Sequence, residues 1–179
     1  MSVSFRSGIE RLKDNIRTVP DFPTPGVLFR DISPILNDGQ LFRLAITLFT
    51  ERYHRKSIEK VAAIDARGFI FAGAVANILG IGMVPIRKKG KLPPPCQEIE
   101  YKLEYGSSCL SLNEGSFQPG ERVLIIDDVL ATGGTAAAAA ALVRQSGATV
   151  VELAFLVEIS PLKGRELLGD TPVYSSIVY

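Results

Sequence analysis

One stretch of this chain, ERVLIIDDVLATGGT at Glu121 to Thr135, is compatible with few structures. Val123 to Ile126 are uniformly apolar and rich in β-branched residues. They do not alternate between an inner and an outer face, so we expect a central strand that is covered on both sides. We expect the strand to end at Asp127 and the alanine-rich run from Ala136 to Val143 to form a helix. Residues 122–146 therefore predict a strand, a short loop and a helix.

The loop of this segment has the composition of an anion site. The first backbone N–H groups of a helix have no acceptor within the helix, and the helix dipole places roughly half a positive charge at that end. Thr and Gly residues leave these donors accessible. We therefore expect backbone and hydroxyl donors of the loop to bind a phosphate group. The loop residues are Ala131, Thr132, Gly133, Gly134 and Thr135.

The acids before the loop narrow the choice of ligand. Asp127 and Asp128 would repel a phosphate placed directly on them, so they require hydroxyl groups or a cation. Two vicinal hydroxyls on the acids and a 5'-phosphate on the loop fit a ribose phosphate. The alternative is that the acids only cap the helix and that the Gly pair only makes a turn. The order of strand, acids, Gly-Gly and Thr favours the ligand site.

Composition places limits on the class of protein. A chain of 179 residues that is 46% hydrophobic can bury a core without disulfide or metal support, so we expect one domain. Its net charge of +1 gives no general attraction to nucleic acid or membrane. Cys96 and Cys109 lack a metal-binding spacing, and we expect reduced thiols in a cytoplasmic protein. The chain shows neither an apolar signal segment nor a run that could span a membrane, so we expect neither secretion nor membrane insertion.

Helical and strand-like patterns alternate along the chain. We expect helices at Gly8–Val19, Gly39–His54, Phe71–Leu79 and Ala136–Gln145, and strands at Val61–Ile64, Met83–Ile86, Arg122–Ile126 and Thr149–Val157. Two strand–helix–strand units follow from this order, and they predict an α/β fold with a parallel sheet flanked by helices and right-handed crossovers. The only histidine, His54, ends a helix, where a surface role is expected.

The segment between these two units differs from the rest. Lys88 to Glu121 contains three consecutive prolines and polar alternation, which predict a mobile hairpin or loop that stands off the sheet and acts as a lid. A basic cluster precedes it, formed by Arg87, Lys88, Lys89 and Lys91. This cluster could be a solvated edge, a nucleic-acid contact or an anion site.

Several segments together resemble the type I phosphoribosyltransferases. VLIIDDVLATGGT is similar to the family's motif for 5-phosphoribosyl diphosphate. The resemblance continues in VPDFPTPGVLFRDISPIL (19–36), AIDARGFIFAGAVA (63–76), IRKKGKLP (86–93), YKLEYG (101–106) and LVEISPLKGRE (156–166). It implies a single phosphoribosyltransferase domain over residues 1–179, with an N-terminal hood at 1–36 and a flexible loop or hairpin at 88–121.

The resemblance implies a glycosyl transfer that belongs to purine salvage. Adenine would react with 5-phosphoribosyl diphosphate to give AMP and diphosphate, with Mg²⁺ bound mainly through diphosphate and ribose oxygens and not directly by the protein. Asp127 and Asp128 would bind the ribose and stabilise positive charge that develops on its ring. The diphosphate would be bound by Asp65, Ala66, Arg67, Arg87, Lys88, Lys91 and Tyr105. In the family, the turn at Asp65 contains a non-proline cis peptide bond.

The resemblance also implies a site for the base. The Phe29 ring would stack on adenine, backbone groups near Leu28 and Arg30 would recognise its edge, and Ile159 would close the opposite face. Glu104 would bind the imidazole ring and handle its proton, and it would be catalytic together with the two aspartates. From residue type alone, Phe29 is more typical of a core residue and Glu104 of a solvated acid.

Two other functions compete with this one. The base could be hypoxanthine, guanine or xanthine, or the chain could be a non-catalytic regulator that contacts DNA or RNA. The sequence shows no helix-turn-helix pattern and no strongly basic face beyond the cluster at Arg87, which disfavours nucleic acid as a partner. The family further implies a homodimer, in which the Arg87 region would reach into the site of the neighbouring subunit.

Overall fold

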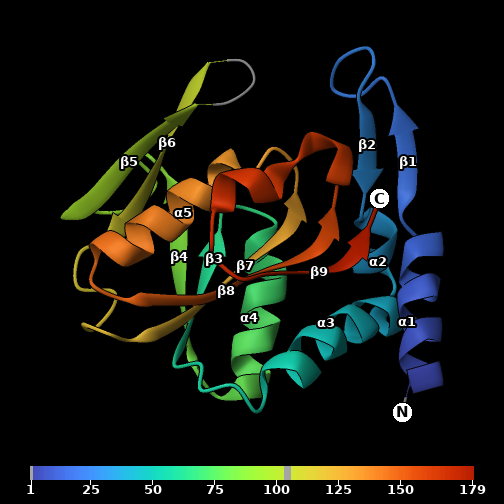
Figure 1. The fold of residues 1–179 in the computed structure, drawn as a ribbon, viewed down its shortest axis with the longest axis horizontal. Helices are drawn as coiled ribbons and strands as arrows, with labels where there is room; N and C mark the ends of the chain where they lie inside the picture. The colour runs from blue at the N-terminus through green and yellow to red at the C-terminus, as the bar shows by residue number, and fades with distance from the viewer. Residues whose placement is uncertain (1, 103–105) are drawn as a thin grey trace. The chain divides into compact units, whose positions relative to one another are not determined.

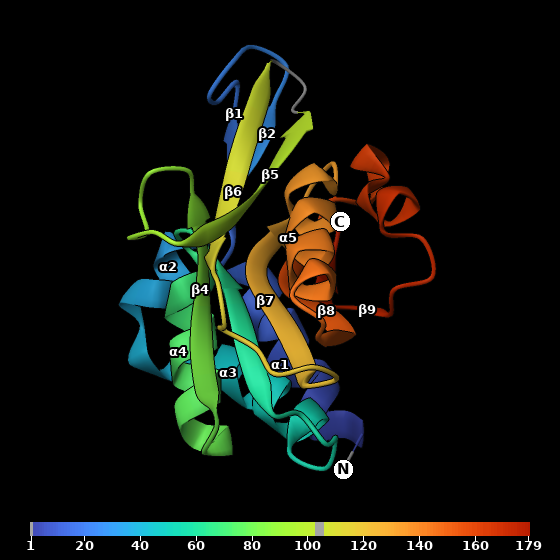
Figure 2. The same cartoon turned by 90° about the vertical axis from the view of Figure 1, so that its left-hand side faces the viewer.

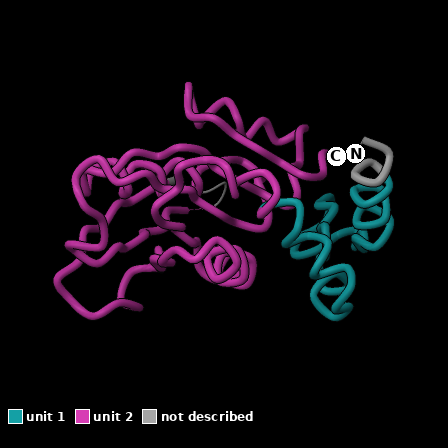
Figure 3. Tube along the Cα trace, turned by 90° about the horizontal axis from the view of Figure 1, so that it is seen from below, with its two compact units in different colours: residues 1–49 teal, residues 50–179 magenta. Residues whose placement is uncertain are grey.

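The computed structural model describes residues 2–102 and 106–179. Glu104 and Tyr105, which the sequence assigned to the base and the diphosphate, lie outside the described residues. The chain divides into two compact units, residues 1–49 and 50–179, which Figure 3 distinguishes by colour. The single domain with a hood at 1–36 therefore stays a prediction.

The first unit contains two helices, a small hairpin and most of a third helix. These elements are α1 (Ser2–Asp14), β1 (Arg17–Pro20), β2 (Leu28–Asp31), α2 (Ser33–Asn37) and α3 (Gly39–Tyr53), of which α3 continues into the second unit. The helix expected at 8–19 instead ends at Asp14. The prediction was wrong there because Thr18 and Val19 are β-branched and Pro20 follows them, so the chain favours an extended strand that pairs with β2.

The second unit is built around a mixed sheet. Its elements are β3 (Lys60–Ile64), α4 (Gly68–Leu79), β4 (Gly82–Lys88), β5 (Cys96–Lys102), β6 (Ser107–Asn113), β7 (Arg122–Leu130), α5 (Gly134–Gln145), β8 (Thr149–Glu158), η1 (Ser160–Leu162), η2 (Gly164–Leu168) and β9 (Val173–Val178). Over the described ranges, the sheet has seven strands in the order β5-β6-β4-β3-β7-β8-β9 (Figure 1).

The spatially adjacent strands β4, β3, β7, β8 and β9 run parallel, which confirms the parallel sheet expected from the sequence. Strand β9 was not expected.

The hairpin expected within 88–121 is formed by β5 and β6. It does not simply stand off the sheet, because β6 pairs antiparallel with β4 at Arg87–Ser111 and Lys88–Leu110. Leu110 and Leu112 are buried and belong to the core. The base of the hairpin is thus an extension of the sheet, whereas its proposed role as a lid stays a prediction.

Strand β7 is longer than the sequence indicated. It was expected to end at Asp127, but it runs to Leu130 and pairs there with Glu158 of β8. The prediction was wrong because β8 offers a ladder of backbone partners along this whole length, and these outweigh the poor strand propensity of aspartate. Asp127 and Asp128 therefore lie on the strand itself.

Helices α4 and α5 cover opposite faces of the sheet (Figure 2). In α5, the buried side chains Ala138, Ala139 and Ala140 allow the helix backbone to approach the sheet closely, while Leu142 and Val143 fill the core. The alanine tract is therefore packed helix, as the sequence predicted. No helix in the described parts of the chain combines the length and apolar character that crossing a membrane requires.

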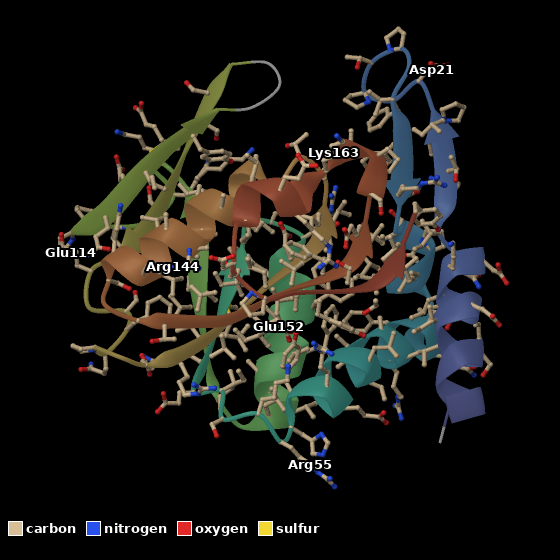
Figure 4. The ribbon with its side chains drawn as sticks, viewed as in Figure 1. Asp21, Arg55, Glu114, Arg144, Glu152 and Lys163 are labelled. Carbon is tan, nitrogen blue, oxygen red and sulfur yellow. The ribbon has the colours of Figure 1, made fainter. Side chains whose placement is uncertain are left out.

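A charged cluster lies inside the second unit. Glu152 of β8, labelled in Figure 4, is buried and accepts hydrogen bonds from the guanidinium of Arg52 at 2.6 and 2.9 Å. The Lys56 ammonium lies 3.1 Å from the same carboxylate. These cations balance the buried charge, because a carboxylate without a partner would be strongly destabilising there.

Candidate active site

The predicted polar residues gather at one edge of the sheet. Strands β4, β3 and β7 are neighbours and run parallel, with Ile64 opposite Ile86 and Ala63 opposite Ile126. Their carboxyl ends therefore meet at the same edge, where ligands bind in open α/β sheets. The turn after β3, the last residues of β4 and the end of β7 supply the side chains of this edge.

The acid pair of β7 concentrates negative charge. Asp127 is half-buried, and its Oδ1 accepts the backbone N–H of Asp128 at 2.8 Å. The Asp128 carboxylate is 3% exposed and accepts a hydrogen bond from Nε of Arg67. Burial, followed by the neighbouring charge of Asp128, raises the pKa of Asp127 well above its usual range. Hydroxyl donors or a cation at this place would relieve that unfavourable charge.

The start of α4 packs directly against the acid pair. A Cβ atom on Gly68 would lie 2.9 Å from Oδ1 of Asp127 and 2.9 Å from the carbonyl oxygen of Ile126. Carbon and oxygen atoms do not approach so closely without repulsion, so only glycine fits unless the strand end shifts. Nothing in the sequence indicated that Gly68 contacts Asp127, because this proximity depends on the tertiary fold.

Cations of the edge are held by acids. Nε of Arg87 donates to Oδ2 of Asp65 at 3.1 Å, and Nη1 donates to the Lys91 carbonyl at 3.1 Å. Asp65 also begins the turn after β3, in which the Asp65–Ala66 peptide bond is cis, as the family resemblance implied. Lys88 and Lys91 are exposed. This group of charges comes from the segments that the sequence assigned to diphosphate.

Lys89 of the predicted basic cluster has a different partner. Its ammonium lies 2.7 Å from the Glu98 carboxylate on β5, and this hydrogen bond raises the pKa of Lys89. Both side chains are largely in contact with solvent, so the pair adds little stability. The basic run is thus divided between the sheet edge and the hairpin.

Residues 131–135, here named the phosphate loop after the ligand expected there, lead into α5. Gly133 has a φ of +85°, which favours glycine, and α5 begins at Gly134 with no side-chain hydrogen bond that caps it in the described structure. The alternative that the two aspartates cap this helix is therefore wrong. Within the loop, Ala131, Thr132, Gly134 and Thr135 are half-buried. The Thr135 hydroxyl donates to the Tyr101 hydroxyl of β5 at 3.3 Å, a contact that the sequence did not indicate.

The residues expected to bind the base belong to different units. Leu28, Phe29 and Arg30 lie on β2 of the first unit, where the Phe29 ring is half-buried and meets Phe22 edge-to-face at 5.1 Å. Ile159 follows β8 in the second unit and is half-buried; its N–H donates to the Leu130 carbonyl at 2.9 Å. Their assembly around a base stays a prediction.

Comparison with known proteins identifies the family. Residues 33–171 match the family described as the phosphoribosyl transferase domain. The chain belongs to this family. The phosphoribosyltransferase predicted from the motifs is therefore confirmed as to family and enzyme class.

This phosphoribosyltransferase has similar relatives over its whole length. It is 55% identical to the adenine phosphoribosyltransferase of Methylacidiphilum infernorum over 179 residues, which cover 100% of both chains. The solved adenine phosphoribosyltransferase of Thermoanaerobacter pseudethanolicus is 41% identical, with a TM-score of 0.93 over 96% of this chain and 99% of that one.

A second solved structure, the adenine phosphoribosyltransferase of Saccharomyces cerevisiae with an imino-altritol bisphosphate and adenine, is 38% identical. Its TM-score is 0.91 over 96% of this chain and 99% of that one. These similarities confirm the type I phosphoribosyltransferase fold.

Carboxylate oxygens, such as those of Asp127 and Asp128, are the ligand atoms that hard cations prefer. Among residues 2–102 and 106–179, however, no group of three or more His, Cys, Asp or Glu residues forms a metal site. Asp127 and Asp128 supply two carboxylates beside the phosphate loop. Burial and the neighbouring charge of Asp128 raise the pKa of Asp127, so a magnesium ion that is bound mainly through substrate oxygens fits beside this pair.

Proposed function

We propose that the protein is an adenine phosphoribosyltransferase, which converts adenine and 5-phosphoribosyl diphosphate into AMP and diphosphate. The observation that carries this proposal is the combination at one sheet edge of an adjacent acid pair, an uncapped helix start and a cluster of cations. Full-length similarity to adenine phosphoribosyltransferases supports adenine as the base.

Binding of the sugar phosphate divides between the loop and the acids. The backbone N–H groups at the start of α5 and the Thr132 and Thr135 hydroxyls bind the 5'-phosphate, with the helix dipole favouring its charge. Asp127 and Asp128 accept hydrogen bonds from the ribose hydroxyls. As the bond to diphosphate breaks, positive charge develops on the ribose ring, and the two carboxylates stabilise it electrostatically.

Diphosphate leaves towards the cations of the edge. Arg67 and Arg87, each oriented by an aspartate, neutralise its charge together with Lys88, Lys91 and the backbone of the Asp65–Ala66 turn. Magnesium, when bound, would supply further charge neutralisation, and Asp127 and Asp128 are the acids that would lie beside it. Tyr105, outside the described residues, completes the proposed diphosphate set.

The base is held by the segment around β2 and by the end of β8. Phe29 stacks on adenine, the backbone of Leu28 and Arg30 recognises its edge, and Ile159 covers the opposite face. Glu104 binds the imidazole ring and accepts its proton. A backbone acceptor placed for the exocyclic amine of adenine would be left unpaired by a 6-oxo purine, which disfavours hypoxanthine and guanine.

The proposed setting is a homodimer in the cytoplasm. Two large apolar side chains of α4 are exposed, Ile70 at 42% and Ile78 at 60%, and burial against a second copy would remove them from water. Cys96 and Cys109 form no disulfide in the described structure, which accords with a reducing compartment. Sedimentation equilibrium tests the dimer: a monomer at micromolar concentration would contradict it.

Steady-state assays with a panel of bases test the proposed reaction. Purified protein with Mg²⁺ and 5-phosphoribosyl diphosphate should form AMP from adenine, with a kcat/KM at least about 100-fold above that for hypoxanthine or guanine. If a 6-oxo purine were turned over faster than adenine, that purine and not adenine would be the substrate. Salt-sensitive binding of DNA or RNA without nucleotide formation would instead support a regulator.

A further inference from the structure

A segment outside the phosphate loop shapes the backbone of that loop. Residues 160–168 form the short helices η1 and η2, and η2 packs beside α5, as both ribbon views show (Figures 1 and 2). A Cβ atom on Gly164 would lie 2.2 Å from the carbonyl oxygen of Ala131, and one on Gly133 would lie 2.2 Å from the carbonyl oxygen of Gly164. The two backbones are therefore in direct contact.

Arg165 fixes the segment that carries Gly164. Its Nε and Nη2 donate to the two carboxylate oxygens of Glu158, each at 2.7 Å, and its Nη1 donates to the Val173 carbonyl at 3.0 Å. Glu158 is the last residue of β8 and only 6% exposed. A bidentate pair between a guanidinium and a buried carboxylate defines the orientation of both groups. The pair thus connects η2 to β8 and β9.

The residues that precede η1 and Gly164 are also held by backbone hydrogen bonds. The Ile159 N–H donates to the Leu130 carbonyl at 2.9 Å, and the Ser160 N–H donates to the Tyr179 carbonyl at 2.9 Å. Leu130 immediately precedes the phosphate loop. Strand ends on both sides therefore hold residues 159–165 against the loop.

We propose that Gly164 and Arg165 are positioning residues for the 5'-phosphate of the substrate. Arg165 holds η2 on the ends of β8 and β9, and the bare backbone of Gly164 supports Ala131 and Gly133 so that the loop donors converge. This inference rests on the proposed function, since it concerns the same sugar-phosphate site. Neither residue touches the reacting atoms in this account.

The expected effect falls on phosphate binding. Relief of a 2.2 Å contact requires the loop or η2 to move by about 1 Å, and a displacement of that size costs on the order of 100-fold when it misaligns bound groups. The backbone N–H groups of the loop cannot adjust to the phosphate one at a time, because they belong to one continuous chain. We therefore expect substrate affinity to fall through the phosphate and not through the base.

The first test replaces Gly164 by alanine. We expect Gly164→Ala to raise the KM for 5-phosphoribosyl diphosphate by roughly 10- to 100-fold, with the KM for adenine changed less than about threefold. Gly82→Ala is the matched control, because its Cβ would meet only Lys60 Cγ at 3.9 Å and its φ is not in the left-handed region. We expect wild-type kinetics from the control.

Product inhibition separates a positioning role from a general loss of structure. AMP carries the 5'-phosphate and adenosine does not, so the ratio of their inhibition constants measures the contribution of the phosphate. We expect Gly164→Ala to raise the inhibition constant of AMP at least about 10-fold and that of adenosine less than about threefold. Equal weakening of both inhibitors would show a general distortion and overturn the proposal.

Arg165 variants provide a second test that avoids the steric change. Arg165→Ala is expected to raise the KM for 5-phosphoribosyl diphosphate as Gly164→Ala does, and Arg165→Lys to restore only part of it, because an ammonium cannot form the bidentate pair with Glu158. Wild-type KM values in folded Gly164→Ala and Arg165→Ala would refute the positioning role. Failure of the wild-type protein to form AMP would refute the proposed function instead.

Discussion

Two adjacent residues of the same type have acquired different environments in this fold. Asp128 is buried and bonded to Arg67, whereas Asp127 is half-buried and accepts the backbone N–H of Asp128. The sequence indicated the pair, because two acids between a buried strand and a Gly-rich loop are a strong pattern, and the role of the pair stays a prediction. It could not predict which acid carries the raised pKa, since that depends on partners distant in the chain.

Asp127→Asn should stabilise the folded protein at neutral pH while lowering its activity. The folded-state pKa of Asp127 is raised, so the free energy of unfolding falls as pH rises from the ordinary value of 3.8 through the raised value. Asparagine removes the charge, and its oxygen can still accept the Asp128 N–H. Urea unfolding at pH 7 should show the gain, which should disappear near pH 4.

The exposed Asp170 provides the control for this substitution, because Asp170→Asn should leave both the stability and its pH dependence unchanged. A loss of stability in Asp127→Asn at pH 7 would contradict the assignment of unfavourable charge to this side chain.

Asp128→Asn should lower kcat by about 100- to 1000-fold, because it removes charge that stabilises the developing cation on ribose. It also deprives Arg67 of its anionic partner. Glu104→Gln should act mainly on the KM for adenine and on the pH profile. Near-wild-type kinetics in both variants, measured at saturating magnesium, would refute the two assignments.

Gly68→Ala should impair the acid pair without touching the substrate. The added Cβ would lie 2.9 Å from Oδ1 of Asp127, so the carboxylate or α4 must move, and we expect kcat to fall at least about 10-fold. A Cβ added to Gly73 of the same helix would meet no such atom within 4 Å, so Gly73→Ala should keep its activity and gain stability by about 0.5–1 kcal/mol. Similar activity in both alanine variants would contradict the role of Gly68.

At the scale of elements, buried strands and packed helices were the most predictable from sequence. Val61–Ile64 and Val123–Ile126 are apolar runs, and both lie in strands of the parallel sheet. The hairpin of β1 and β2 and the strand β9 were missed because these strands are only four to six residues long and contain polar residues that interrupt the apolar pattern. The extension of β7 to Leu130 depended on its pairing with β8.

The charged cluster of Glu152 with Arg52 and Lys56 should make the free energy of unfolding depend on pH in the acid range. Burial is the largest single influence and opposes ionisation, but hydrogen bonds led by those of Arg52 lower the pKa of Glu152 to about 2 from 4.5. The stabilisation is therefore fully present above pH 4.5 and is lost as pH falls through about 2. This lowering of the Glu152 pKa corresponds to a contribution on the order of 3 kcal/mol to the free energy of unfolding.

Glu152→Gln should reduce the free energy of unfolding at pH 7 by roughly that amount and weaken its decline between pH 4.5 and 2, as measured by urea denaturation. Glu166, whose side chain is 70% exposed, supplies the control substitution. An unchanged pH dependence in Glu152→Gln would show that the cluster is not a major source of acid sensitivity.

At the scale of the whole molecule, the proposed function depends on segments that are far apart in the chain but end at one edge. The turn after β3, the end of β4 and the end of β7 lie close because their strands are parallel neighbours. This gathering could be predicted from sequence, since parallel strands place their carboxyl ends together. The contact of Gly164 with the phosphate loop could not, because no local pattern indicates which distant backbone covers a loop.

Calorimetric titration of 5-phosphoribosyl diphosphate with magnesium into the wild-type protein tests the central claim most directly. We expect saturable binding at one site per chain, with affinity reduced at least about 10-fold in an Asp127→Asn, Asp128→Asn double variant that melts cooperatively. Absence of binding by folded wild-type protein, or equal binding by both proteins, would contradict the assignment of the sugar phosphate to the end of β7.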